Sequence, residues 1–196
     1  TVIIAAGGGT VLDMAGFTAS TYLRGVPHIL IPTTLLAIVD ASIGGKNGIN
    51  SKYGKNHIGT IYPPKAIFAD LDVLKTLPPH ETAFGMSEIV KIGLVGNKRL
   101  LASLGDPNAF DALVCEAAKE KIRVVSLNSV RSKIRNTLSF GHTIAHGLEL
   151  AAHYRLPHGE AVALGLIGEC RIAERLGLAP AGLAERIVAP LLAASQ

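Results

Sequence analysis

The sequence predicts a chain in two parts, an α/β part followed by an all-helical part. In the first part, short apolar runs are separated by helical or irregular sequence, an order typical of a parallel sheet. From Glu81 onward the apolar residues recur at helical spacing, and the composition changes at Pro78-Pro79. We therefore expect a boundary near Pro78, with domains at residues 1–78 and 79–196.

The first part begins with a strand that runs into glycines. Residues 1–6 (TVIIAA) are an apolar run typical of a buried strand. Gly7, Gly8 and Gly9 then turn the chain into a helix, which we expect to reach about Leu23.

Two more apolar runs follow, with a polar stretch between them. VPHILIP at 26–32 lies between prolines and predicts a second strand, and AIFAD at 66–70 predicts a third. The intervening GGKNGINSKYGKNHIG, at 44–59, is rich in Gly, Asn and Lys and predicts a long loop.

The second part is helical between prolines. Pro107, Pro157 and Pro180 fall between the periodic segments, where proline is expected because it cannot continue a helix. The predicted helices lie at 81–95, 110–127, 134–152, 158–176 and 181–193.

Composition excludes several classes of protein. The chain has 196 residues, of which 48% are hydrophobic and 17% charged, a composition that excludes a disordered protein. It contains no apolar run near the ~20 residues that a membrane-spanning helix requires. The net charge of +4 comes without a basic run, which argues against nucleic-acid binding.

The chain begins at Thr1 directly in a strand, so we expect a fragment. Cys115 and Cys170 lack metal-type spacing, and we expect buried free thiols in a reducing compartment.

The glycine turn after the first strand has two interpretations. Glycines before a helix let the backbone approach a pyrophosphate, which the helix N-terminus attracts. The turn lacks the GxGxxG order of the usual dinucleotide fingerprint, so a simple tight connection fits equally well. Asp13, one turn into the helix, fits either a ligand contact or stabilisation of the helix dipole.

The predicted loop carries basic and amide side chains among glycines. Lys46, Lys55 and Asn56 lie in it, with Arg24 and Asp40 nearby in sequence. Lysines in a flexible glycine-rich stretch favour a cradle for phosphate or carboxylate. An exposed flexible loop without a ligand is the alternative.

Histidines in the helical part predict a metal site. His142 and His146 are four residues apart in FGHTIAHGLE and share one helix face, and His158 follows in PHGEAVALG. Glu88, in GMSEIVKIG, has Lys91 three residues on. Imidazoles with one carboxylate make a catalytic zinc set that leaves one position open. The alternative is a group of core histidines without a metal.

Taken together, these segments resemble the 3-dehydroquinate synthase family. The stretch from GGGTVLDMAG to DVLKTLPP, then GMSEIVKIGL, FGHTIAHGLE and HGEAVALG, matches that family in order and spacing over nearly the whole chain. The resemblance implies an α/β nucleotide-binding (Rossmann-like) portion followed by an all-helical metal-binding domain. It also implies NAD and a divalent metal, Zn or Co, as cofactors.

The activity implied by the resemblance belongs to the shikimate pathway. The family converts 3-deoxy-D-arabino-heptulosonate 7-phosphate to 3-dehydroquinate and phosphate, through transient oxidation by NAD, phosphate elimination, re-reduction and cyclisation. We therefore expect a cytoplasmic enzyme with a phosphorylated sugar acid as substrate, no nucleic-acid or membrane partner, and a homodimer at full length.

The resemblance also implies a role for individual residues, motif by motif. The metal ligands would be Glu88, His142 and His158, and the catalytic residues His146, Lys46, Lys91 and Arg135. Substrate would contact Arg24, Asp40, Lys55, Asn56 and Lys121. NAD would lie against Gly8, Gly9, Asp13, Thr33, Thr34, Asp40 and Thr76.

Two positions depart from the family pattern. Ser139 stands where an Asn is usual, and Arg131 where an acidic residue is usual. Related cyclases of the epi-valiolone and deoxy-inosose type differ at such substrate-contacting positions, whereas Arg135 and His146 favour dehydroquinate synthase. The alternatives are therefore another sugar-phosphate cyclase, a polyol dehydrogenase, or a binding remnant without turnover.

Overall fold

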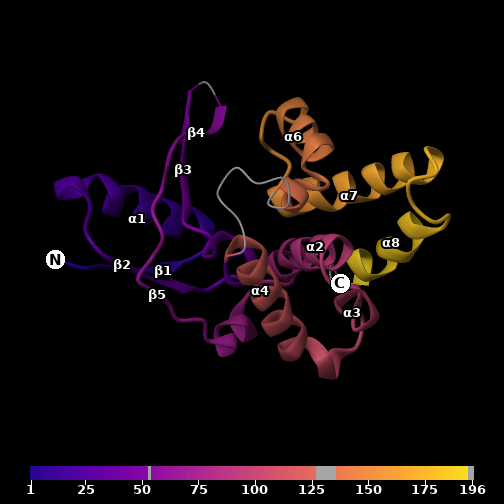
Figure 1. Cartoon of the computed structure of the whole chain (residues 1–196), viewed down its shortest axis with the longest axis horizontal. Coiled ribbons are helices and arrows are strands. Elements are labelled where there is room, and N and C mark those ends of the chain that lie inside the picture. Colours follow the sequence, from indigo (N-terminus) through magenta and orange to yellow (C-terminus); the bar gives the residue numbers. More distant parts are fainter. Residues whose placement is uncertain (53, 127–135, 194–196) are drawn as a thin grey trace. The chain divides into compact units, whose positions relative to one another are not determined.

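The computed structural model describes residues 1–52, 54–126 and 136–193, and the chain forms two compact units. The units are Thr1–Leu77 and Pro78–Gln196, and together they make a mixed α/β fold (Figure 1). Among the described residues, no helix has both the length and the apolar character needed to cross a membrane.

The first unit is built on a parallel sheet. Strands β1 (Ile3–Gly7), β2 (His28–Pro32) and β5 (Ala66–Ile67) pair in the order β1-β2-β5. Helix α1 (Gly9–Thr21) connects β1 to β2, as a parallel pair requires. Its buried Leu12 packs with apolar residues of both strands. The third strand is shorter than predicted and α1 ends two residues before Leu23, but the strand order agrees with the alternation in the sequence.

The glycine-rich stretch predicted to be a loop is instead a β-hairpin, so that prediction was wrong. Strands β3 (Lys46–Ser51) and β4 (Gly54–Ile61) pair antiparallel, with Ile49 opposite Ile58 (Figure 1). The buried Asn47 secures the base of the hairpin, because its Nδ2 donates to the carbonyls of Gly45, at 3.1 Å, and Tyr62, at 3.2 Å. Cross-strand backbone bonds and packing against α1 override the low strand propensity of Gly and Asn.

Three short helical turns complete the first unit. They are η1 (Tyr22–Arg24), the π-helical turn η2 (Ala37–Ala41) and η3 (Leu71–Thr76). Asp70 caps the last of these, since its carboxylate accepts the backbone N–H of Asp72 at 2.9 Å. η3 therefore starts shortly after β5 ends, and Asp70 and Thr76, at its two ends, line one cavity together with Thr33.

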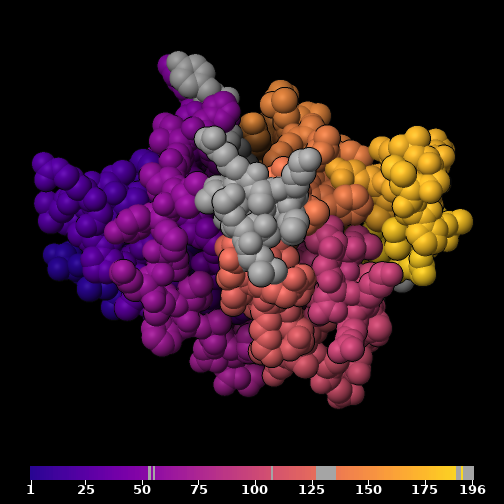
Figure 2. All heavy atoms as spheres, in the orientation of Figure 1, coloured from indigo at the N-terminus to yellow at the C-terminus, as the bar shows by residue number. Residues whose placement is uncertain are grey.

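The described part of the second unit is helical. Its elements are α2 (Pro79–Val95), α3 (Lys98–Ala102), η4 (Pro107–Ala109), α4 (Phe110–Ser126), η5 (Thr137–Ser139), α6 (His142–Ala151), α7 (His158–Arg175) and α8 (Leu183–Ala193). Its core contains Val90, Ala145, Val162, Leu166 and Ile187, so α2, α6, α7 and α8 share one apolar centre. The space-filling view shows the surface of α8 in yellow (Figure 2).

Four of the five predicted helices are confirmed, with ends within two residues of the predicted ones. The helix predicted at 134–152 differs from the structure. The pattern predicts a helix over 134–152, of which residues 134 and 135 lie outside the described part of the chain; within that part, α6 begins at His142. Gly141 has φ +83°, a left-handed conformation that interrupts the helix, and a short 3₁₀ turn precedes it. Phe140, just before the break, packs on the same core cluster as Ala145 of α6, so the apolar spacing continues across the break.

The two cysteines differ in exposure. Cys170 is buried in α7, and burial raises the pKa of its thiol to about 11. Cys115 is exposed, so the prediction of two buried thiols was wrong. It follows the buried Val114 in α4, and the next position on a helix turns by about 100° onto the solvent face.

Candidate functional site

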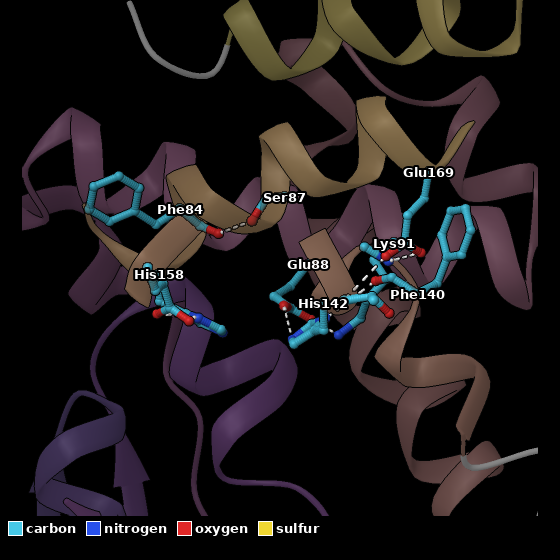
Figure 3. A network of polar contacts seen from close by, with 11 residues as sticks. Phe84, Ser87, Glu88, Lys91, Phe140, His142, His158 and Glu169 are labelled. Atoms are coloured by element: carbon cyan, nitrogen blue, oxygen red, sulfur yellow. Dashed lines mark hydrogen bonds and ion pairs between the residues drawn. The ribbon is translucent and has the colours of Figure 1, made fainter. Parts of the chain in front are cut away.

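Three helices of the second unit bring the predicted metal ligands together. Glu88 lies in the middle of α2, His142 is the first residue of α6, and His158 is the first residue of α7. One donor atom from each lies within 4.8 Å of the other two. Figure 3 shows the Glu88 carboxylate facing the His142 ring. Glu88 lies 54 positions before His142 (142 − 88 = 54), and His158 lies 16 positions after it (158 − 142 = 16), so only the packing of the unit assembles the three donors.

The Glu88 carboxylate is buried and incompletely satisfied. The residue is 1% exposed, and neither carboxylate oxygen accepts a hydrogen bond of regular geometry from the described residues. The Lys91 ammonium forms an ion pair with Oε2, and His142 Nε2 lies 3.8 Å from Oε1. A buried carboxylate is costly unless charge and hydrogen bonds compensate it, so these oxygens suit a cation.

The two imidazoles are oriented by bonds at their other nitrogen. Nδ1 of His158 lies 3.1 Å from Oε1 of Glu149, and Nδ1 of His142 lies 3.3 Å from the carbonyl of Phe140. With Nδ1 donating in each ring, Nε2 is the atom left for a metal, the arrangement that metal-binding histidines usually show. Burial, and then the charge of Lys91, lower the pKa of His142 and favour the neutral ligand form. The donor set therefore fits a divalent metal ion.

Sequence reasoning missed two glutamates of this centre. Glu149, the partner of His158, is 3% exposed on α6, and Glu169 on α7 accepts the backbone N–H groups of Gly141 and Thr143. A glutamate in a helix is usually a solvent-facing residue, so composition offered no signal. The spacing did offer one, because Glu149 lies seven residues after His142 and therefore on the same face.

His146 lies beside the three ligands. Its ring centroid is 5.4 Å from that of His142, at 87°, and 6.4 Å from that of His158, at 24°. The side chain is exposed, whereas Lys91 on α2 and Lys121 on α4 are 2% and 8% exposed. The histidine that resembles a proton-transfer residue is thus next to the candidate metal position and reachable from solvent. Arg131 and Arg135 lie outside the described residues.

In the first unit, the glycine turn packs against the residues after β2. Gly8 precedes α1, and a Cβ there would lie 3.1 Å from Cγ2 of Thr34. Thr33 donates its N–H to the carbonyl of Gly7 at 3.0 Å, and it lines a cavity of about 550 Å³ with Thr76. The strand ends thus gather four of the predicted nucleotide contacts, Gly8, Gly9, Thr33 and Thr34, with Thr76 across the cavity. Asp13 in α1 and Asp40 in η2 are partly exposed.

The remaining predicted substrate contacts are dispersed along the first unit. Arg24 is exposed in η1 with φ +65°, and Lys46 is exposed at the start of β3. Lys46 pairs with Ile61, six residues from Lys55, so about 20 Å of strand separates the two lysines. Asn56, with φ +55°, accompanies Lys55, whose side chain lies outside the described residues.

Family comparison covers almost the whole chain. Residues 1–84 match the profile described as 3-dehydroquinate synthase N-terminal, and residues 85–195 match 3-dehydroquinate synthase C-terminal. Among curated proteins, the 3-dehydroquinate synthase of Symbiobacterium thermophilum is 41% identical over 199 residues, covering 97% of this chain and 56% of that protein. The one from Campylobacter concisus is 46% identical over 190 residues, covering 94% and 55%.

Solved structures agree with this relationship. The chain is 30% identical to ValA, the 2-epi-5-epi-valiolone synthase of Streptomyces hygroscopicus with NAD⁺ and Zn²⁺ bound, with a TM-score of 0.92 over 99% of this chain and 57% of that one. A 2-deoxy-scyllo-inosose synthase in complex with carbaglucose-6-phosphate, NAD⁺ and Co²⁺ is 33% identical, with a TM-score of 0.86 over 98% and 56%.

The chain spans little more than half the length of these relatives, and the match includes both halves of the family pattern. The ligand-bearing segments of α2, α6 and α7 lie within the C-terminal match, and the glycine turn lies within the N-terminal one. The chain therefore belongs to the 3-dehydroquinate synthase family.

Proposed function

We propose that this chain carries the nucleotide turn and the metal centre of a 3-dehydroquinate synthase. The reaction converts 3-deoxy-D-arabino-heptulosonate 7-phosphate to 3-dehydroquinate and phosphate. The observation that carries the proposal is the convergence of Glu88, His142 and His158 within 4.8 Å, in a chain 41% to 46% identical to curated 3-dehydroquinate synthases. Residues 1–78 would be the Rossmann-like NAD part, and residues 79–196 the metal and substrate part.

The proposed cofactors are NAD and a divalent metal, Zn or Co. Glu88, His142 and His158 would hold the metal, and the turn at Gly8 and Gly9, with the other nucleotide contacts named above, would hold NAD. The related valiolone and inosose synthases, solved with NAD⁺ and Zn²⁺ or Co²⁺, support this choice. When bound, these groups supply the polarisation and reversible oxidation of one substrate hydroxyl.

The remaining residues would bind substrate and move protons. His146, exposed beside the ligands, would transfer protons at its ring nitrogens, a task suited to imidazole near neutral pH. Lys91, Lys46 and Arg135 would place positive charge on the reacting groups. The residues proposed to hold phosphate, carboxylate and hydroxyls are Arg24, Asp40, Lys55, Asn56 and Lys121.

The test is phosphate release from the heptulosonate phosphate by the intact protein. We expect release to require both NAD and the metal, without net accumulation of NADH, because a cyclase of this type returns its hydride. His146→Gln should lower the rate by about 10²-fold or more while leaving metal content unchanged. Absence of phosphate release from metal- and NAD-loaded protein would contradict the proposal, and net NADH formation with glycerol would indicate a polyol dehydrogenase instead.

A second sugar-phosphate cyclase activity is the alternative favoured by Ser139. This residue replaces the usual Asn and lines a cavity of about 420 Å³ with Thr137, Thr143 and Glu169. To decide between them, phosphate release is measured with two kinds of substrate. One is the heptulosonate phosphate, which has a carboxylate, and the other is a sugar phosphate that has no carboxylate. Faster turnover of the sugar phosphate without a carboxylate would identify the other cyclase activity. In that case, Ser139→Asn should raise the rate with the heptulosonate phosphate relative to the rate with the other substrate.

The isolated chain needs its own measurement. If it retains zinc after dialysis yet shows no NAD binding by calorimetry, it acts only as a metal-binding remnant under those conditions. We further propose, from the family relationship, a cytoplasmic homodimer for the intact enzyme. Sedimentation of the purified full-length protein would test the dimer directly.

A further inference from the structure

Helix α6 begins without a cap of its own. The residue before it is Gly141, which has no side chain to accept the first N–H groups of the helix. The Gly141 carbonyl accepts the N–H of Ala145, in the ordinary helical pattern. His142 therefore sits on a turn whose leading N–H groups need an acceptor from elsewhere in the unit.

Glu169 of α7 provides that acceptor. Its Oε2 accepts the N–H of Gly141 at 2.8 Å, and its Oε1 accepts the N–H of Thr143 at 3.2 Å. The two carboxylate oxygens thus bind the backbone on both sides of His142. A negative charge at this end of a helix is also favoured by the helix dipole.

The contact lies at one end of the pairing between α6 and α7. Glu149, near the end of α6, meets His158 at the start of α7, whereas Gly141 and Thr143, at the start of α6, meet Glu169 eleven residues along α7. The helices are therefore antiparallel, and each end of the pair is secured by one glutamate. Glu149 orients a ligand ring directly, and Glu169 acts on the ligand backbone.

We propose that Glu169 is a positioning residue for His142, which sets where Nε2 of that histidine stands relative to Glu88 and His158. The inference rests on the proposed metal centre. The carbonyl of Phe140 orients the ring of His142. The position of this carbonyl depends in turn on the backbone at the start of α6. The clamp by Glu169 spans residues 141–143 and so includes the ligand.

The same helix offers a matched control. Glu174 of α7 accepts the N–H of Ala184 at 2.7 Å, and Ala184 is the second residue of α8, just as Thr143 is the second residue of α6. No residue of the metal set lies on α8. A change at Glu174 therefore reproduces the loss of an inter-helix cap without altering a ligand.

The experiment measures Co²⁺ binding to the intact protein and to Glu169→Ala, Glu169→Gln and Glu174→Ala. We expect Glu169→Ala to weaken Co²⁺ affinity about tenfold and to change the visible absorption of the bound ion, whose intensity reports ligand geometry. Glu169→Gln keeps one acceptor oxygen and should weaken affinity less than Glu169→Ala does. Glu174→Ala should keep both affinity and spectrum while losing thermal stability.

Three outcomes overturn the proposal. An unchanged spectrum and affinity in Glu169→Ala would show that the clamp does not position His142. Equal changes in Glu169→Ala and Glu174→Ala would show a general effect of losing a cap. Absence of Co²⁺ binding by the unaltered protein would contradict the metal centre itself, and the positioning role of Glu169 with it. The first two outcomes differ from this one, because in them the unaltered protein still binds Co²⁺.

Discussion

At the scale of single residues, the site depends on charges buried in α2. Glu88 and Lys91 are 1% and 2% exposed, three residues apart, and form an ion pair. Neither residue type is usually buried unless it is paired. Their spacing was visible in the sequence, but their burial was not, because α2 is enclosed by helices that come from later in the chain.

Removing Lys91 should expose the cost of burying Glu88. In protein treated with a chelator, Lys91→Met should lower the free energy of unfolding by about 3 to 5 kcal/mol, because the carboxylate loses its counter-charge. Saturating Zn²⁺ should restore much of the loss. Urea denaturation with and without metal measures both values. Lys119→Met, which breaks the exposed pair with Glu116, should change nothing measurable, and equal losses in the two variants would refute the argument.

His28 on β2 is a second buried group, outside the candidate site. It is 1% exposed, stacks on Tyr62 with ring centroids 5.5 Å apart, and neither ring nitrogen has a hydrogen-bond partner among the described residues. Burial lowers the pKa of His28 below its ordinary 6.5. The unfolded chain therefore binds a proton at a higher pH than the folded chain does.

This difference makes stability depend on pH in a known direction. As pH falls through 6.5 toward the lower folded pKa, the unfolded state gains a proton first, so the free energy of unfolding falls, by at most about 1.4 kcal/mol per pH unit. His28→Phe keeps the stack on Tyr62 and should remove this part of the slope. Denaturation at pH 7.5 and lower measures it. Identical slopes for His28→Phe and the unaltered protein would contradict the assignment.

At the scale of elements, the close approach of α6 to α7 sets the distance between two ligands. A Cβ on Gly165 of α7 would overlap the carbonyl oxygen of Gly141, and one on Gly168 would lie 2.7 Å from Cδ1 of Ile144. Glycines on α7 thus let the start of α6 lie directly against it. Helical periodicity predicted both helices, but it carried no information on how closely they approach.

Gly165→Ala should therefore disturb the metal centre without touching a ligand. The added methyl would push the start of α6 away from α7, lowering stability by about 1 to 3 kcal/mol and weakening Zn²⁺ binding. Gly147→Ala is the matched change, because nothing lies within 4 Å of a Cβ there, and it should be neutral or stabilising by about 1 kcal/mol or less. Calorimetric Zn²⁺ titration and thermal unfolding of both variants measure the effects. Unchanged Zn²⁺ affinity in Gly165→Ala would contradict this role of the close approach.

At the scale of the whole molecule, the two compact units carry different parts of the candidate chemistry. The three ligands belong to Pro78–Gln196, and the glycine turn with its threonines belongs to Thr1–Leu77. Each unit has its own buried cluster, around Leu12 and Leu30 in the first and around Val162 and Leu166 in the second. Metal and nucleotide should therefore stabilise different segments.

Hydrogen exchange measured by mass spectrometry can resolve the two effects. Adding a chelator to metal-loaded protein should speed amide exchange in α2 and at the starts of α6 and α7, because the bound ion no longer stabilises those segments. NAD should instead slow exchange at the β1–α1 turn. Chelation that loosens β1 and α1 as much as α6 would contradict a centre confined to the second unit.

The sequence by itself determined the features that depend on neighbouring residues. Helical periodicity located α2, α4, α7 and α8, prolines marked the gaps between them, and apolar runs located β1 and β2. Residue chemistry indicated a metal site among His142, His146, His158 and Glu88, and the family resemblance selected Glu88, His142 and His158 as its ligands. All of this follows from local spacing and from the donor atoms of each side chain.

Only the tertiary structure decided the features that depend on distant segments. It paired β3 with β4 where glycine and asparagine predicted a loop, it interrupted the helix before His142, and it exposed Cys115. It also assigned Glu149 and Glu169 to the histidines of the candidate centre. Strand pairing, burial and inter-helix hydrogen bonds depend on contacts between segments that are distant in sequence, and local sequence patterns carry no information on those contacts.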